Sequence, residues 1–436
     1  MGETGTMLNS NNFGIKMHQL ITDLYPICRS ITGNGFRESL GIIRRHIPLE
    51  IHEVPTGTPV FDWSIPKEWN IRDAYVKDPS GHKVIDFKQS NLHLVSYSIP
   101  IHKKMPLSEL KEHLYSIPEY PDWIPYRTSY YKENWGYCLS HRSLESLKEG
   151  EYEVYIDTTL EDGSLTYGDY LIQGQTTNEV LISCHCCHPS LCNDNLSGMA
   201  LAALLAKSLT SRSLRYSYRF IFIPVTIGSI TWLCINQDKV TRIKHGLVVA
   251  NVGDPGKLTY KKSRQGDAEI DRVVSYVLNH NAKEYQIVDF IPYGYDERQY
   301  CSPGFNLPMG SLTRTPYDQY PEYHTSADNL DFVQPAYLAD SFATYSTVID
   351  ILEKNKKYLN NNPMCEPQLG RRGLYSTFGG KKDKNQYEMA MLWILNYSDG
   401  SNTLLDIAEK SGIKFDVLSQ AADELEKHNL LQTLID

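Results

Sequence analysis

Hydrophobic positions in the middle of the chain form short apolar runs that alternate with helical patterns. Three runs are almost wholly apolar, which is typical of strands buried on both faces of a sheet: VLISC (180–184), RFIFIP (219–224) and GLVVANV (246–252). Between and after them, three segments carry the apolar spacing of helices: 197–209, 227–236 and 268–280. Strands that alternate with helices predict an α/β fold with a mainly parallel sheet covered by helices on both faces.

The pattern changes on the N-terminal side of this region. Residues 17–25 and 37–46 have helical spacing and predict two helices that belong to the α/β core. From about residue 54 to 155, proline and aromatic residues are frequent, and stretches such as VIDFKQSNLHLVSYSIP alternate between apolar and polar positions. This composition and this alternation predict a β-rich domain inserted early in the core.

The C-terminal region also differs from the core. CEPQLGRRGLYSTFGGKKDK is rich in Gly and Lys and predicts a linker, and three helical patterns with a turn at Ser411-Gly412 follow it, as in a winged-helix domain. The predicted order is therefore N-terminal helices of the core (1–53), an inserted β-rich domain (54–155), the main part of the α/β core (156–364), a linker (365–384) and a winged-helix-like domain (385–436).

Charge and composition limit the partners. The net charge of the 436-residue chain is −9, and from Asn385 onward three Lys or Arg residues face nine Asp or Glu residues, so we expect no nucleic-acid partner despite the winged-helix pattern. No apolar run is long enough to cross a bilayer and the N-terminus does not resemble a signal peptide, which predicts a cytoplasmic protein without a membrane partner. The oligomeric state stays open.

Nine cysteines, an odd number, do not suggest a disulfide framework in a protein without an export signal. Four of them lie between residues 184 and 192. A structural zinc site would need paired Cys-x-x-Cys spacings, which are absent, and a Cys nucleophile with a His partner has four candidates and nothing to choose between them. We therefore predict that these cysteines are buried apolar residues.

The segment ISCHCCHPSLCNDNLSG (182–198) concentrates imidazole, thiol and carboxylate groups. It leaves a buried strand and enters a helix, and ligands of open α/β sheets gather at the carboxyl ends of the strands. Because proline cannot donate to a ladder, Pro189 predicts that the strand ends near His188. His185 and His188 would then lie at the end of the strand, six to nine residues before Asp194. Imidazole and carboxylate ligands are typical of zinc.

Three further polar segments come after later strands or turns. They are NVGDPG (251–256) with Asp254, YGYDERQY (293–300) with Asp296, Glu297 and Arg298, and TPYDQYPEYHTSADNLDFV (315–333) with His324 and Asp328. If the strands are parallel, these segments and the cysteine-rich segment can meet at one edge of the sheet. That convergence would form a single polar site.

Several of these positions also have a structural interpretation. Asp194 could cap the helix that follows it, and Asp254, before Pro-Gly, could be an ordinary turn residue. His185 could be a core histidine. Asp328 either orients His324 as a hydrogen-bond acceptor or caps the segment that follows.

The order of the motifs resembles the zinc aminopeptidases and carboxypeptidases of the bacterial leucyl aminopeptidase type, also called the MH clan. VLISCHCC is similar to their His-x-Asp strand end, although Cys187 stands where the orienting Asp would be. NDNLSG matches the segment with the metal-bridging Asp, GDPG loosely supplies a further Asp, and EYHTSAD matches the segment with the last His. The resemblance implies that 156–364 forms a zinc-aminopeptidase-like core, with zinc held by His185 or His188, Asp194, Asp254 and His324.

A narrower resemblance covers nearly the whole chain, whereas the clan motifs cover about residues 156–355. The strings CHPS, DERQYCSPG and EYHTSADNL resemble a bacterial family of aminopeptidase-like proteins. Members of that family carry an inserted β-domain and a C-terminal winged helix, and they are associated with surface-polysaccharide gene sets.

One departure from the clan pattern matters more than the others. Where the clan has a Glu-Glu pair, this chain has Val225-Thr226. In the clan the first Glu is the general base and the second binds a second zinc, so the departure implies one zinc rather than two and a base supplied from elsewhere. General base catalysis contributes about 10²–10⁴-fold to the rate. Glu297 is the predicted substitute, and Arg298 and Tyr323 are predicted to bind a substrate terminus or an oxyanion.

The predicted function is metal-dependent hydrolysis of a small peptide or a related amide. One alternative is an amide hydrolase that acts on an acylated amino sugar, which would suit the polysaccharide association of the resembling family. The other is a metal-binding scaffold that kept the fold and lost turnover, and Val225 favours it.

Overall fold

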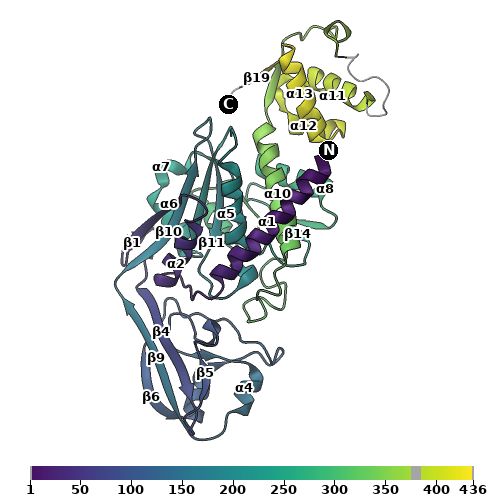
Figure 1. Ribbon diagram of the computed structural model, residues 1–436. Helices are drawn as coiled ribbons and strands as arrows, with labels where there is room; N and C mark the ends of the chain where they lie inside the picture. The colour runs from purple at the N-terminus through teal and green to yellow at the C-terminus, as the bar shows by residue number, and fades with distance from the viewer. Residues whose placement is uncertain (1, 375–383, 435–436) are drawn as a thin grey trace. The chain divides into compact units, whose positions relative to one another are not determined.

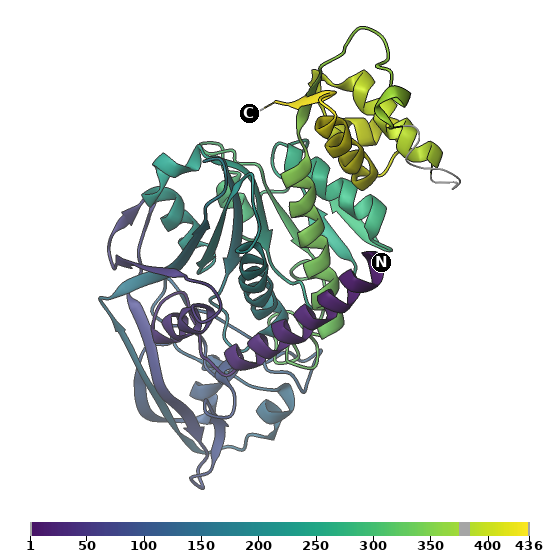
Figure 2. The ribbon, with the colours of Figure 1, turned by 45° about the horizontal axis from the view of Figure 1, so that its top comes forward.

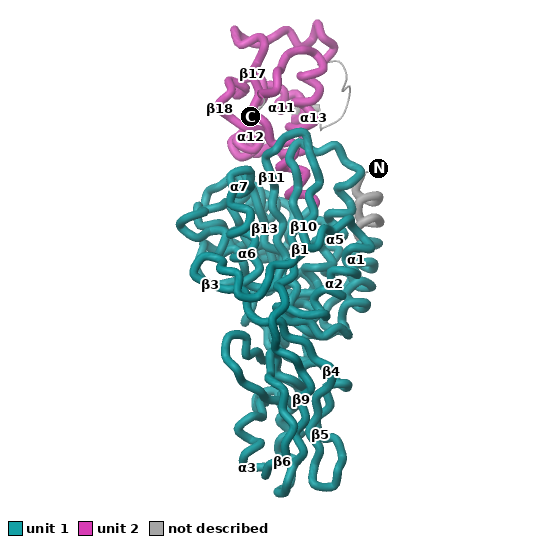
Figure 3. Tube along the Cα trace, turned by 90° about the vertical axis from the view of Figure 1, so that its left-hand side faces the viewer, with its two compact units in different colours: residues 1–345 teal, residues 346–436 magenta. Residues whose placement is uncertain are grey.

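The computed structural model describes residues 2–374 and 384–434, and it describes side chains over 12–374 and 386–434. The chain forms two compact units, residues 1–345 and residues 346–436, which Figure 3 shows in different colours. The first unit contains the predicted core and the inserted domain. The second contains the predicted winged-helix-like domain.

The first unit is organised around an eight-stranded sheet (Figure 1). Its strands lie in the order β1 (Glu50–Pro55), β10 (Ser164–Ile172), β12 (Ser217–Ile223), β11 (Glu179–His185), β13 (Ile243–Val249), β16 (Met309–Thr313), β14 (Leu258–Lys261) and β15 (Tyr285–Val288). The four central strands β12, β11, β13 and β16 are parallel, as predicted. The edges differ from the prediction, because β10 and β14 run antiparallel to their inner neighbours.

Helices cover both faces of this sheet. Figure 3 shows α1 (Gly2–Leu24), α2 (Asn34–Ile43) and α5 (Gly198–Leu209) on one side and α6 (Ile227–Ile235) on the other. The Ala- and Leu-rich helix α5 packs against β11, β12 and β13 and is itself covered by α1, so the N-terminal helix belongs to the core, as predicted. The remaining long helices of this unit are α8 (Glu269–Asn281) and the first part of α10 (Pro335–Lys354).

The inserted domain is built on an antiparallel sheet of four strands, visible below the core in Figure 2. The order is β5 (Lys83–Asp86), β4 (Glu68–Lys77), β9 (Glu151–Glu161) and β6 (Ile101–Pro106). Buried and partly exposed positions alternate along β9, which fits a sheet with one covered face. The predicted limits of 54–155 differ from these strands at both ends, because β1 pairs within the core sheet and β9 continues to Glu161.

A buried ion cluster ties three strands of the core sheet together. The guanidinium of Arg219 on β12 donates to both carboxylate oxygens of Asp169 at 2.8 and 2.9 Å and to Glu179 at 2.7 Å. The indole N–H of Trp232 on α6 also donates to Asp169. All four side chains are buried, so the two carboxylates depend on Arg219 for charge compensation.

Substituting Arg219→Met is expected to lower the free energy of unfolding by about 3–5 kcal/mol, because two buried carboxylates lose their cation. Urea unfolding followed by tryptophan fluorescence measures the change. The matched control is Arg72→Met, since Arg72 pairs with Asp157 at the surface and such pairs contribute about 0–1 kcal/mol. Equal losses in the two variants would show that the Arg219 cluster does not stabilise the sheet.

The second unit has the order of elements expected of a winged helix. It contains β17 (Lys357–Asn360), α11 (Lys384–Tyr397), β18 (Asp399–Thr403), α12 (Leu404–Ser411), α13 (Phe415–Lys427) and β19 (Leu431–Thr433). The three strands form one antiparallel sheet, and the three predicted helices are present. Thr403 and Asp406 form a capping box at the start of α12, and Gly412 ends it with φ 68°, at the predicted turn.

The predicted linker (365–384) lies partly outside the described residues, because 375–383 are not described. Its described part includes a short 3-10 helix, Gly370–Arg372. Across the described residues, every helix is either too short or too polar to span a bilayer.

Candidate metal centre

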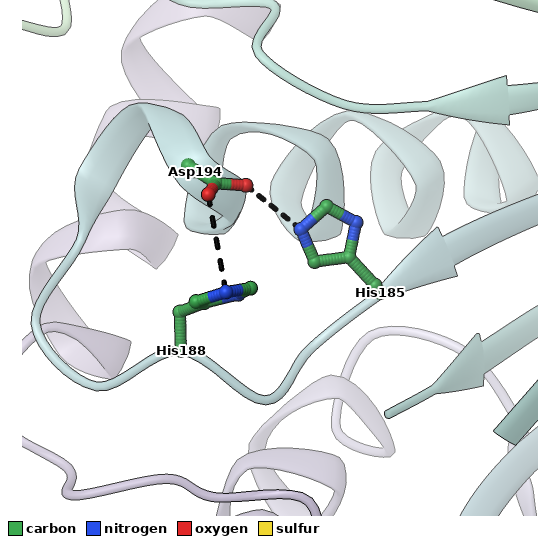
Figure 4. A group of neighbouring side chains, drawn as sticks. All are labelled: His185, His188 and Asp194. Atoms are coloured by element: carbon green, nitrogen blue, oxygen red, sulfur yellow. Dashed lines mark hydrogen bonds and ion pairs between the residues drawn. The ribbon is translucent and has the colours of Figure 1, made fainter. Parts of the chain in front are cut away.

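The segment between β11 and α5 carries three buried groups that can bind a metal. Strand β11 ends at His185, three residues earlier than the sequence suggests, and the loop then reaches an irregular helical turn, Cys192–Ser197. The backbone of Asp194 leaves the helical region in this turn, with φ −110° and ψ 84°. As a result, His185, His188 and Asp194 point towards one another (Figure 4).

The geometry is that of three imidazoles around one carboxylate. The Nε2 atom of His185 lies 2.8 Å from Oδ1 of Asp194, and the Nε2 atom of His324 lies 3.0 Å from Oδ2. The Nε2 atom of His188 lies 4.0 Å from the same Oδ2, which is beyond hydrogen-bond distance. We call these four residues the His/Asp cluster. His324 is far from Asp194 along the chain, and the fold brings the two side chains together.

The surroundings of His188 and Asp194 shift the pKa values of these two cluster members. Burial lowers the pKa of His188 to about 3, so this imidazole is neutral at neutral pH. Burial opposes the ionised form of Asp194, but the three neighbouring imidazoles act in the other direction and hold its pKa well below the usual range. Neutral imidazoles and an ionised carboxylate are the forms that bind metal ions.

Asp328 holds the turn that carries Asp194. Its Oδ1 accepts the backbone N–H of Asn193 at 2.6 Å, its Oδ2 accepts that of Asp194 at 3.0 Å, and its carbonyl accepts that of Cys192. Burial raises the pKa of this carboxyl to about 8. The sequence offered two roles for Asp328, orienting His324 or capping the following segment, and its hydrogen bonds instead position Asp194.

Asp254, which follows strand β13, stabilises the same turn through a hydrogen bond to Asn193. Its two oxygens accept hydrogen bonds from the side-chain amide of Asn193, the backbone N–H of Gly256, and both the N–H and the hydroxyl of Thr315. Both carboxylate oxygens are therefore occupied by donors of the protein. The structure leaves Asp254 outside the His/Asp cluster, in contrast to the expectation drawn from GDPG.

The inserted domain contributes an aromatic residue to the cluster that the sequence analysis did not identify. The backbone N–H of Tyr126 donates to the carbonyl of His324 at 2.7 Å, and Pro125 forms a β-bridge with Thr325. The ring of Tyr126 meets the rings of His188 and His324 edge to face. Tyr323, predicted to bind substrate, stacks on His324 with ring centroids 3.9 Å apart.

Asp296 is a buried carboxylate that interacts electrostatically with His185 of the cluster. Its Oδ1 accepts the hydroxyl of Ser229 at 2.7 Å, and its Oδ2 has no hydrogen-bond partner among the described residues. Burial raises the pKa of Asp296 to about 6, and the nearby charge of His185 acts in the opposite direction. The neighbouring Tyr295 stacks on His185.

Glu297 and Arg298 have other contacts. The carboxylate of Glu297, the predicted base, pairs with the Nζ of Lys261 at 2.5 Å. The guanidinium of Arg298 lies over the ring of Tyr293, 5.5 Å from its centroid. Within the described part of the chain, neither side chain forms a hydrogen bond or an ion pair with the His/Asp cluster.

The two positions that depart from the clan pattern lie side by side. The backbone N–H of Val225 donates to the Sγ of Cys187 at 3.4 Å. Burial raises the pKa of the Cys187 thiol, which disfavours a nucleophilic thiolate. All four cysteines between 184 and 192 are buried and free, as predicted.

The donor set of the cluster fits zinc. Three imidazole nitrogens and a carboxylate are typical zinc ligands, with bonds of about 2.0–2.2 Å. An ion at such distances from several ligands requires donor atoms about 3–4 Å apart, and the Nε2 atoms of the cluster lie 2.8–4.0 Å from the oxygens of Asp194. The residues present therefore fit zinc, since His185, His188 and Asp194 offer donor atoms within 4.8 Å of one another and His324 lies against the same carboxylate.

Two known families match parts of the chain. Residues 18–355 match the family described as "Domain of unknown function (DUF4910)", and residues 356–433 match a winged helix-turn-helix family. The chain belongs to the DUF4910 family. The second match confirms the winged helix of the second unit, and together the two matches cover most of this DUF4910 protein.

Two findings come from Clostridium acetobutylicum. A protein provisionally named a polysaccharide biosynthesis protein with an aminopeptidase-like domain is 56% identical over 424 residues, which cover 97% of the DUF4910 chain and 98% of the relative. A crystal structure of a protein provisionally called a peptidase is 54% identical, with a TM-score of 0.94 and 99% of each chain covered.

More distant structures share the fold. A zinc aminopeptidase from Bacillus subtilis superposes with a TM-score of 0.57 at 12% identity, covering 78% of the DUF4910 chain and 94% of the enzyme. A peptidase M28 precursor from Shewanella amazonensis gives 0.56 at 12% identity, with 81% and 97% covered. The zinc-aminopeptidase-like fold predicted from the sequence is therefore confirmed.

Proposed function

We propose that this DUF4910 protein is a zinc-dependent hydrolase of a peptide or a related amide bond. The observation that carries the proposal is the convergence of the imidazoles of His185, His188 and His324 on the carboxylate of Asp194. One zinc ion, rather than two, would be held by these residues. When bound, zinc polarises an amide carbonyl and activates water for hydrolysis.

The protein surrounds this site with groups that restrict water and fix the ligands. Tyr126 covers His188 and His324, Tyr323 stacks on His324, and Tyr295 stacks on His185. Packed aromatic rings lower the local dielectric and keep imidazoles in one orientation. Because Tyr323 stacks on His324, it would contact a substrate bound at the cluster, whereas Arg298 lies over Tyr293 and is given no role in the proposal.

We assign proton transfer to Asp296 in place of Glu297. Among the described residues, Glu297 is ion-paired with Lys261 through Oε1 and forms no hydrogen bond or ion pair with the His/Asp cluster, whereas the buried Asp296 interacts electrostatically with His185 and keeps Oδ2 without a hydrogen-bond partner. A base is most effective when its pKa lies near the working pH, and burial moves the pKa of Asp296 in that direction. Asp296 would accept a proton at Oδ2 while Ser229 holds Oδ1.

A metal-binding scaffold without turnover is the second candidate. It is favoured by Val225, which cannot accept a proton, and by Cys187, which replaces the Asp expected beside it.

The acidic winged-helix domain suits contacts with protein better than with nucleic acid, because its nine Asp or Glu residues would repel phosphates. A cytoplasmic location stays a prediction.

Metal analysis combined with a substrate panel tests the proposal. We expect about one zinc per chain in the purified protein and hydrolysis of at least one substrate among aminoacyl amides and N-acetylated amino sugars. One zinc per chain without hydrolysis of any substrate would favour the scaffold. Hydrolysis that survives complete removal of metal by a chelator would contradict zinc dependence.

A further inference from the structure

A small polar cavity lies over strands β14 and β16, next to Tyr295. Its volume is about 80 Å³. Its polar lining residues are Thr259 and Lys261 on β14, Gln286 on β15, Ser311 and Thr313 on β16, Glu297 at the start of the short helix α9 (Glu297–Tyr300), and Gln319. Tyr295, Tyr317 and Ile291 supply part of the apolar wall. We call it the β14–β16 cavity.

The strand register explains why the polar groups gather there. Thr259 pairs with Thr313, and Lys261 pairs with Ser311. Because side chains two residues apart on a strand point to the same face, all four lie on one face of the sheet. Each of these side chains belongs to a residue at most 9% exposed, although polar residues are uncommon on a buried sheet face.

Several oxygens in this cavity have no hydrogen-bond partner. Among the described residues, none donates to or accepts from Oγ1 of Thr259 or Oγ of Ser311. Both oxygens of Glu297 lack a hydrogen bond, and Oε2 also has no ion pair. Buried polar atoms of folded proteins are nearly always hydrogen-bonded, to protein, water or ligand. The cavity is therefore built to receive groups that form hydrogen bonds.

The charges in the cavity exclude most kinds of ligand. The Nζ of Lys261 is ion-paired with Glu297 at 2.5 Å and donates to the carbonyls of Tyr293 at 2.8 Å and Ile291 at 3.3 Å, so its charge is already balanced and an anion would be buried beside the Glu297 carboxylate. Lys261 already balances Glu297, so a second cation would be buried without a counter-ion. An apolar group would leave the unpartnered oxygens unsatisfied.

We propose that the β14–β16 cavity binds a neutral, hydroxyl-bearing group of the substrate that is processed at the His/Asp cluster. The inference rests on the proposed function, because it takes the His/Asp cluster as the place where the substrate is processed. Tyr295 connects the two places, since it lines the cavity and stacks on His185. A cavity of about 80 Å³ holds a group of a few non-hydrogen atoms. Such a group is either a hydroxymethyl arm with a neighbouring sugar hydroxyl, or the side chain of a hydroxylated amino acid.

Ligand-observed NMR with four probes on the full-length protein tests the proposal. N-acetyl-D-glucosamine represents the sugar, and the N-acetyl amides of L-threonine, L-leucine and L-lysine represent hydroxylated, apolar and cationic side chains. We expect the sugar or the threonine probe to bind at least about 5-fold more tightly than the leucine and lysine probes. The preferred probe of the two identifies the source of the hydroxyl group.

Isosteric variants link this preference to the cavity. Thr259→Val and Ser311→Ala each remove one unpartnered hydroxyl, and each is expected to weaken the preferred probe by about 2- to 10-fold without lowering the melting temperature. Thr313→Val is the matched control, because the hydroxyl of Thr313 already donates to backbone carbonyls. This control is expected to bind the probe within about twofold of wild type.

A preference for the leucine or lysine probe, no preference at all, or an unchanged preference in both Thr259→Val and Ser311→Ala would overturn the inference. Zinc content and hydrolysis are measured on the same samples. If zinc and hydrolysis are present but the hydroxylated probes do not bind selectively, the cavity assignment fails and the proposed function stands. If the probes bind selectively but zinc is absent, the proposed function fails.

Discussion

Replacing His324 by alanine is expected to weaken zinc binding by at least about 100-fold, so that the purified variant retains little metal after dialysis. His324 supplies one of three imidazoles around Asp194, with its Nε2 3.0 Å from Oδ2. Removing it leaves two imidazoles on one short segment of chain and opens the side of the cluster covered by Tyr126 and Tyr323. Zinc per chain, measured by inductively coupled plasma mass spectrometry, gives the result.

The backbone at His324 has φ 54°, which alanine adopts less readily than asparagine. His324→Asn is therefore made alongside His324→Ala, and both are checked by thermal unfolding. His280→Ala is the matched control, because His280 is an exposed residue of α8 whose ring contacts Tyr276, one turn earlier on the same helix. Wild-type zinc content in both His324 variants would show that the metal, if bound, lies elsewhere.

The second large effect is expected from Asp296→Asn, which should lower kcat by about 10²–10⁴-fold on the substrate identified by the panel. The amide is nearly isosteric and can still accept the hydroxyl of Ser229, but it cannot take up a proton. Zinc content and the melting temperature should stay close to wild type. Steady-state kinetics on zinc-loaded protein gives the measurement.

Glu297→Gln provides the comparison for Asp296→Asn. Lys261 keeps two carbonyl partners in that variant, and among the described residues Glu297 pairs with Lys261 rather than with the cluster, so we expect kcat to fall by less than about 10-fold. The reverse result, a large loss for Glu297→Gln with wild-type turnover for Asp296→Asn, would restore the assignment made from the sequence.

The local sequence predicts the core well because its elements are determined by short-range patterns. The apolar runs at 180–184 and 219–224 fall largely within β11 and β12, and the Ala- and Leu-rich stretch forms α5. These segments are buried on all sides, so their hydrophobicity alone reveals them. The antiparallel edges were not predicted, since strand direction at the edge of a sheet depends on long-range connections.

The candidate site was predictable only where its residues are close in sequence or fall in a specific motif. His185, His188 and Asp194 share one segment, and the motif around His324 is distinctive. Asp254 and Glu297 were assigned from their positions after strands or in turns, but the partners that occupy them come from other strands and loops. Sequence order gives no information about such pairings.

Tyr126 is a residue of the candidate site that the sequence did not predict. It lies in the inserted domain, well before the cysteine-rich segment, and nothing in its surroundings marks it as part of a metal site. Its position is fixed by the β-bridge between Pro125 and Thr325, which joins distant parts of the chain. The frequent aromatic residues of 54–155 were the available signal, and they predicted a β-rich domain rather than a site.

X-ray diffraction from a crystal of the purified protein, recorded on both sides of the zinc absorption edge, tests the central claim most directly. We predict one anomalous peak within about 2.0–2.2 Å of Asp194 and of the Nε2 atoms of His185 and His324, with His188 as a further ligand. A crystal of zinc-loaded protein whose anomalous peak lies away from Asp194, or that shows none, would contradict the account.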